Sequence, residues 1–213
     1  MVIMSISCFL QHIYNTELAG KPDAVRAKIT FQIARRAMEY SRRKAVPANP
    51  ATIEDLIANF ESKSYPQMYQ DMYLTTVHAD FRQRRRGSTR GERETRRRYA
   101  IILVNRKVLD RAFASCTFFA MDGTFKTTPQ VSASFRDRAA QMLCITADYS
   151  GKPVVLYVVL MQTRKIPLYR EVFKAINRLE PRFNPGQMMA DFERAMRNSY
   201  METFPDTRLL GCR

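Results

Sequence analysis

The chain has 213 residues, of which 46% are hydrophobic and 26% charged, so it can bury a core and is not a disordered or low-complexity protein. Its 35 lysines and arginines outnumber 20 aspartates and glutamates, and the net charge of +15 favours a polyanionic partner such as nucleic acid. Four cysteines without a CxxC pair form neither a disulfide framework nor a zinc site, and no apolar run approaches the roughly 20 residues of a membrane helix.

Residues 1–81 carry a mostly helical pattern. A first amphipathic helix is indicated after Pro22 by apolar residues that are four, four and seven positions apart: Val25, Ile29, Ile33 and Tyr40. A second helix is indicated by Asn49 as N-cap, Pro50 at the first helical position and apolar residues at i, i+3, i+4 and i+7: Ile53, Leu56, Ile57 and Phe60. A third helix is predicted to begin near Pro66 and to carry Met68, Met72 and Leu74 or Val77 along one face.

Residues 82–98 have the sequence RQRRRGSTRGERETRRR, with nine arginines, two glutamates and no apolar residue. Such a segment cannot bury a face, so we expect a solvated basic linker between a helical region, residues 1–81, and a second domain, residues 99–213. The arginines can bind DNA phosphates, act as a nuclear localisation signal, or keep the linker solvated. The candidate DNA-binding arginines are Arg82, Arg84, Arg85, Arg86, Arg90, Arg93, Arg96, Arg97 and Arg98.

After residue 99 the pattern becomes that of strands. Three runs rich in β-branched, aromatic or apolar residues predict an antiparallel meander: residues 116–125, 141–149 and 152–161. Four further elements follow in order, namely a helix at 168–179, a strand at 187–192, a helix at about 193–203 and a strand at 208–212. The helix at 168–179 is amphipathic, with an apolar face of Tyr169, Val172, Phe173 and Ile176. The order β-β-β-α-β-α-β predicts an α/β fold with a mixed sheet.

Two aspartates stand at strand ends in this order. Asp122 ends the first strand of the meander and Asp191 ends the fourth strand. If these strands are parallel neighbours, both carboxylates project from the same edge and can share divalent cations such as Mg²⁺. The alternative is structural, because an aspartate before Gly123 can form a turn and Asp191 can cap the following helix. Lys126 lies near the same edge, where it can reach a phosphate or simply be solvated.

Several blocks of the C-terminal region resemble the MULE transposase domain of Mutator-like elements, in the same order and over about half of the chain. They are DGTFKTTP at 122–129, TADYSGKPVVLYVVL at 146–160, MMADFERAM at 188–196 and FPDTRLLGC at 204–212. The resemblance implies an RNase H-like core that cleaves and joins DNA with a metal-binding Asp-Asp-Glu triad and Mg²⁺ or Mn²⁺. Asp122 is similar to its first acid and Asp191 to its second.

The sequence departs from the family pattern at both ends. It stops at Arg213, before the position of the third acid, and Glu193 belongs to the Asp-Phe-Glu block rather than to that position. Members from animal genomes carry a FLYWCH zinc finger before a helical linker similar to residues 20–100, whereas Cys8 and His12 alone do not make a zinc site. We therefore expect an incomplete RNase H-like sheet that does not cleave DNA as given.

Two functions remain open on this basis. The first is a transposase-derived nuclear DNA-binding protein with a partial DDE-type core. The second is a domesticated, non-catalytic module that binds DNA or protein, for instance in transcription. DNA is the expected partner in the first case, no membrane is expected to be involved, and a homo-oligomer is compatible with the sequence.

Overall fold

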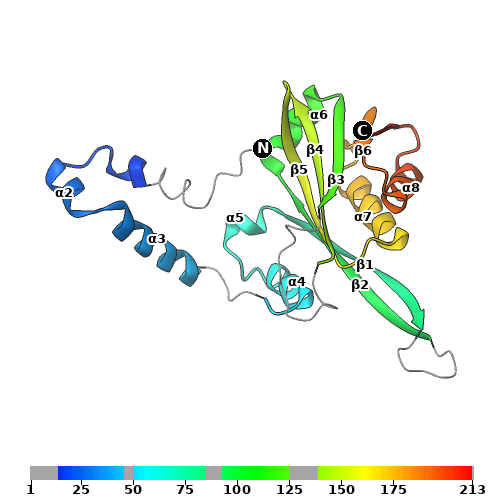
Figure 1. Ribbon diagram of the computed structural model, residues 1–213, viewed down its shortest axis with the longest axis horizontal. Coiled ribbons are helices and arrows are strands. Elements are labelled where there is room, and N and C mark those ends of the chain that lie inside the picture. The colour runs from blue at the N-terminus through cyan, green and yellow to red at the C-terminus, as the bar shows by residue number, and fades with distance from the viewer. Residues whose placement is uncertain (1–13, 46–49, 85–92, 125–138, 213) are drawn as a thin grey trace.

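The computed structural model describes residues 14–45, 50–84, 93–124 and 139–212, and within them seven strands form one mixed sheet (Figure 1). The strands are β1 (Tyr73–Arg84), β2 (Arg93–Val104), β3 (Phe118–Thr124), β4 (Gln141–Tyr149), β5 (Lys152–Met161), β6 (Gln187–Ala190) and β7 (Arg208–Gly211). Their order in the sheet is β1-β2-β5-β4-β3-β6-β7. The pairs from β1 to β3 are antiparallel, whereas β6 adds in parallel to β3 and β7 in parallel to β6. The predicted mixed α/β sheet is confirmed.

One face of the sheet packs against α6 (Arg106–Ser115), α7 (Ile166–Leu179) and α8 (Arg194–Thr203). Helix α7 has the predicted apolar stripe, and its buried residues are Leu168, Tyr169, Val172, Phe173, Ala175 and Ile176. They meet alternate residues of the strands, such as Met121, Leu143 and Val159, because successive side chains of a strand point to opposite faces. This layer is the main hydrophobic core.

The opposite face is covered near β2 and β5 by α4 (Ile53–Glu61), which the short helix α5 (Gln67–Gln70) follows. Ile53, Ile57 and Phe60 form a second buried cluster with Ile101 of β2 and Leu160 of β5. The spacing of these α4 residues is the spacing predicted from the sequence. The helix starts later than predicted, because Thr52 rather than Asn49 is its N-cap, and Asn49 lies outside the described residues.

The prediction of a helix that runs from Pro66 to Val77 is wrong. Only α5 is helical there, and residues 73–84 form strand β1, with β-branched Thr75, Thr76 and Val77 in its first half. Residues 82–98 were expected to form a solvated linker, but the described residues of this range are the end of strand β1 and the beginning of strand β2. Their pairing from Tyr73 to Arg84 supplies the backbone hydrogen bonds that an isolated stretch of arginines would lack. The sheet thus includes strands on both sides of the expected domain boundary.

The first amphipathic pattern does form helices, α2 (Asp23–Lys28) and α3 (Phe31–Ala45), separated at Ile29 and Thr30. Their apolar residues are exposed, with Ile33 at 58% and Tyr40 at 61% of full exposure. Figure 1 shows both helices lying apart from the sheet. Among the described residues, no helix combines the length and apolarity that crossing a membrane would need.

Candidate functional site

The two aspartates directly follow the last paired residues of two parallel strands. Strands β3 and β6 pair in parallel up to Met121 opposite Ala190; Asp122 follows within β3, and Asp191 is the first residue after β6. Helix α7 stands between the meander and β6 in the chain and packs on one face of the sheet. The predicted neighbourhood of the two strand ends is therefore confirmed.

Neither structural alternative for these aspartates describes their positions. Asp122 and Gly123 lie within β3 rather than in a turn. The N-cap of α8 is Glu193 rather than Asp191. Asp191 Oδ1 instead accepts a hydrogen bond of 3.1 Å from the backbone N–H of Glu193, which is the pattern of an Asx turn. This bond holds the half-buried carboxylate at the start of the loop before α8.

The charge of Asp122 acts on its cross-strand neighbour. Cys144 of β4 is directly opposite Asp122, and burial, followed by the charge of Asp122, raises the pKa of the Cys144 thiol. The Asp122 side chain itself is exposed. An exposed carboxylate beside a half-buried one is a donor set of hard oxygens, which suits Mg²⁺ or Mn²⁺. Within the described residues, no group of three or more His, Cys, Asp or Glu side chains is arranged to hold a metal ion.

A polar cluster that the sequence did not reveal lies next to this pair. The Tyr169 hydroxyl of α7 is 2.8 Å from Gln141 Oε1 of β4 and 2.9 Å from Glu193 Oε1. A hydroxyl has one proton, so Tyr169 donates to only one of these oxygens at a time. Burial, with the nearby Glu193 carboxylate, raises the pKa of Tyr169, and burial also raises the pKa of Glu193. Tyr169 was predicted only as part of the apolar face of its helix.

The described arginines of residues 82–98 fall into two groups. Arg82, Arg93 and Arg97 are exposed, and Arg97 Nε is 3.0 Å from Asp80 Oδ1 across the strand pair. Arg96 and Arg98 are half-buried, and Arg96 Nε is 2.6 Å from Glu94 Oε1. Arg84 belongs to β1 by its backbone. Arg85, Arg86, Arg90 and Lys126 lie outside the described residues.

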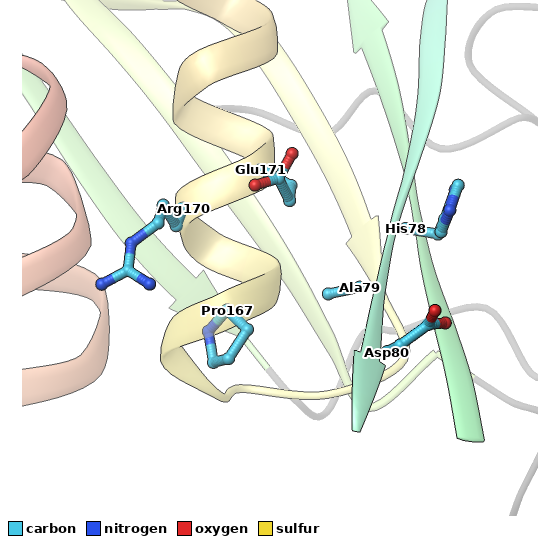
Figure 2. Close-up of a pocket in the computed structure, with 6 residues that line it drawn as sticks. All are labelled: His78, Ala79, Asp80, Pro167, Arg170 and Glu171. Carbon is cyan, nitrogen blue, oxygen red and sulfur yellow. The ribbon is translucent and has the colours of Figure 1, made fainter. Parts of the chain in front are cut away.

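A hollow of about 270 Å³ lies between β1 and the start of α7. Its lining residues are His78, Ala79, Asp80, Pro167, Arg170 and Glu171. Figure 2 shows the side chains of Arg170 and of His78 and Asp80 directed to opposite sides. Arg170 also binds Glu202 through two hydrogen bonds, of 2.5 and 2.9 Å. Because its charged groups diverge and are paired elsewhere, this hollow is a weaker candidate for a site than the strand ends.

The fold and the site define a mixed α/β domain with two aspartates at the ends of adjacent parallel strands. Residues 118–213 match the family model of the MULE transposase domain. The resemblance stated from the sequence is therefore confirmed over this range, and it indicates a transposase-derived function. No match was found among curated proteins or among solved structures.

Proposed function

We propose that this chain is a transposase-derived DNA-binding protein whose residues 118–213 form much of an RNase H-like, DDE-type core. The observation that carries the proposal is the parallel pairing of β3 with β6, which makes Asp122 and Asp191 neighbours. The family match over the same residues supports it. Three antiparallel strands followed by two strands added in parallel, with α7 and α8 between them, agree with such a core.

In this proposal Asp122 and Asp191 bind a divalent cation, Mg²⁺ or Mn²⁺. When bound, such a cation orients a phosphate group and favours attack on it by water or a hydroxyl. The protein contributes the parallel strands that place the two carboxylates. It also contributes the backbone N–H of Glu193, whose hydrogen bond fixes one oxygen of Asp191 and leaves the other for a cation.

Metal binding can be measured directly by titrating the protein with Mn²⁺ and following free Mn²⁺ by electron paramagnetic resonance. We expect Asp122→Asn and Asp191→Asn each to weaken Mn²⁺ binding at least tenfold, because each removes a charged ligand. Asp148→Asn is the matched control, since Asp148 is an exposed aspartate of β4 at the opposite end of the sheet. An equal loss in all three variants would mean non-specific attraction and would contradict a site at the strand ends.

The second candidate is a domesticated module that binds DNA or protein without catalysis. It is favoured by the net charge of +15, which attracts nucleic acid whether or not the strand ends hold a metal ion. The transposase-derived protein and a DNA-binding module both meet chromosomal DNA, so both predict a nuclear protein. Incubation of supercoiled plasmid with Mg²⁺ or Mn²⁺ separates them: nicking that Asp122→Ala abolishes supports the nuclease, and salt-sensitive DNA binding without nicking supports the module.

A further inference from the structure

The arginine-rich part of β1 and β2 projects beyond the sheet as a two-stranded ribbon, residues 79–84 and 93–98, here called the basic ribbon (Figure 1). Strands β1 and β2 pair as far as Arg84 opposite Arg93, whereas β2 pairs with β5 only from Ala100 to Val104. The Gln162 side chain accepts a hydrogen bond of 2.9 Å from the Tyr99 backbone N–H where β5 ends. A two-stranded ribbon without a third strand is only marginally stable in water.

The basic ribbon has two different faces, because residues opposite each other in the register share a face. The inner face turns toward α7, and its pairs are Ala79–Arg98, Phe81–Arg96 and Gln83–Glu94. The outer face turns the other way, and its pairs are Asp80–Arg97, Arg82–Thr95 and Arg84–Arg93.

The inner face is already occupied by contacts within the chain. The guanidinium of Arg96 is paired with Glu94, and Phe81 packs against the main core. The ammonium group of Lys165, the N-cap residue of α7, lies 5.5 Å from the centre of the Phe81 ring. This face therefore anchors the ribbon to the helix.

Positive charge on the outer face rises toward the tip. Arg97 is balanced by Asp80, the next pair places exposed Arg82 opposite Thr95, and exposed Arg93 follows on the same face. Exposed arginines gathered on one face attract a polyanion and repel a basic partner.

The basic ribbon leaves the sheet at the end that carries the two aspartates. Ala100 is opposite Met161, which is opposite Gln141, and β4 runs on beside the carboxyl end of β3. Asp122 is opposite Cys144, Cys144 is opposite Val158, and Val158 is opposite Leu103, so these residues share one side of the sheet. Leu103 and Arg97 are six residues apart on β2, so this is also the side of the outer face. Asp122 and Arg97 are three strands apart across the sheet and six residues apart along it. At about 4.8 Å per strand and 3.4 Å per residue, the distance between them is roughly 25 Å.

We propose that the outer face of the basic ribbon is a docking surface for duplex DNA, which it holds across the strand ends that carry Asp122 and Asp191. This inference rests on the proposed function, because it assumes a DNA-binding protein. A two-stranded ribbon fits the major groove of duplex DNA, which is about 12 Å wide. The separation from the aspartates is less than one helical turn of about 34 Å, and a duplex that spans it passes over α4, which packs on Ile101 and Leu160 of the same face.

The two faces allow a matched test with equal loss of charge. Arg82→Gln/Arg93→Gln removes two arginines from the outer face, and Arg96→Gln/Arg98→Gln removes two from the inner face. Affinity for a fluorescent 30-base-pair duplex is measured by anisotropy between 50 and 200 mM KCl. We expect the outer variant to bind at least tenfold more weakly at 100 mM KCl and its log-affinity slope against log salt to flatten by about 1.8, or 0.9 for each lost phosphate contact. We expect less than a threefold change for the inner variant.

The outcomes separate the ribbon from the wider proposal. Equal losses of duplex affinity in both variants would mean that binding depends only on the net charge of the protein. That result would overturn the outer face as the docking surface. Duplex binding unchanged in both variants would overturn the ribbon but not the proposed function, whereas no duplex binding by the wild type would overturn the proposed function itself. Arg82→Lys/Arg93→Lys should keep the salt slope, and thermal unfolding of every variant shows whether an effect comes from unfolding.

Discussion

Gly123 follows the first aspartate in a position where a side chain has no room. A Cβ atom at Gly123 would clash with the side-chain amide of Gln141, which is fully buried and receives a hydrogen bond from Tyr169. The missing side chain thus lets β4 place the Gln141 amide over β3 at the residue after Asp122, on the face that α7 covers. The glycine of the Asp-Gly-Thr-Phe block has a packing reason that its sequence context alone does not reveal.

We predict that Gly123→Ala destabilises the protein by about 1 to 3 kcal/mol, the usual cost of overpacking a buried site. Urea unfolding measures the change. Gly186→Ala is the control, because a Cβ there meets nothing within 4 Å, and it should stay within about 0.5 kcal/mol of the wild type. Adding Gln141→Ala removes the clash, so the double variant should lose less than the sum of the two single variants. Full additivity would contradict the clash.

The raised pKa of Glu193 predicts a pH effect on stability. Burial is its main cause, and the Asp191 carboxylate adds to it, while Tyr169 and Arg164 act in the opposite direction. The folded state holds this proton more tightly than the unfolded chain does, so the stabilisation is present at low pH and is lost as the pH rises from 4.5 through the folded pKa.

Glu193→Gln should therefore be more stable than the wild type at neutral pH, with a gap that opens above about pH 4.5, the ordinary carboxyl value. A glutamine amide can donate to the Tyr169 oxygen while Tyr169 donates to Gln141, which satisfies all three groups. Urea unfolding between pH 4 and 8 without divalent cations measures the gap. A constant difference over this range would show that Glu193 ionisation does not oppose folding.

At the scale of single elements, the stability of helix α4 depends on the hydrogen bonds of its first turn. Thr52 Oγ1 accepts a hydrogen bond of 3.0 Å from the Asp55 N–H, and Asp55 Oδ2 accepts one of 3.1 Å from the Thr52 N–H. This capping box satisfies two backbone donors that the helix leaves without partners. Asn49, the N-cap predicted from the sequence, lies outside the described residues.

Thr52→Ala should cost about 1 kcal/mol of unfolding free energy, the usual value of an N-cap. Thermal or urea unfolding measures it. Asn49→Ala should change stability by less than about 0.5 kcal/mol, because Thr52 and Asp55 already form the capping box. The opposite ranking would return the start of the helix to the position that the sequence predicted.

Elements that carry their own pattern were predicted correctly, and elements that depend on a distant partner were not. Helix α7 and strands β4 and β5 show clear periodicity or continuous apolar runs, which need no knowledge of the fold. Strand β1 has only a short alternation of its own, Val77, Ala79 and Phe81, and its arginine-rich end is a strand because β2 pairs with it. The neighbourhood of Asp122 and Asp191 followed from strand order, whereas the contacts of Tyr169 join three segments and no local pattern contains them.

At the scale of the whole molecule, helix α4 packs on the sheet. Phe60 of this helix is stacked on Tyr73 of β1 with 4.9 Å between ring centres, and it also contacts Tyr65. Ile101 of β2 and Leu160 of β5 complete the cluster. Strand β5 is in turn paired with β4, next to the strand that carries Asp122. These contacts predict that residues from α4 to β7 unfold as one cooperative unit.

Phe60→Ala tests this cooperativity. Removing a buried phenylalanine ring costs about 3 to 5 kcal/mol, and Phe60 is only 8% exposed. If the unit is cooperative, urea unfolding shows one transition at lower urea, and amide hydrogen exchange of β3 accelerates although no residue of β3 belongs to the Phe60 cluster. Met68→Ala, at a residue 64% exposed, should leave both measurements unchanged. Faster exchange confined to α4, α5 and β1, or a second unfolding transition, would instead assign the helix and the strand-end site to separate folding units.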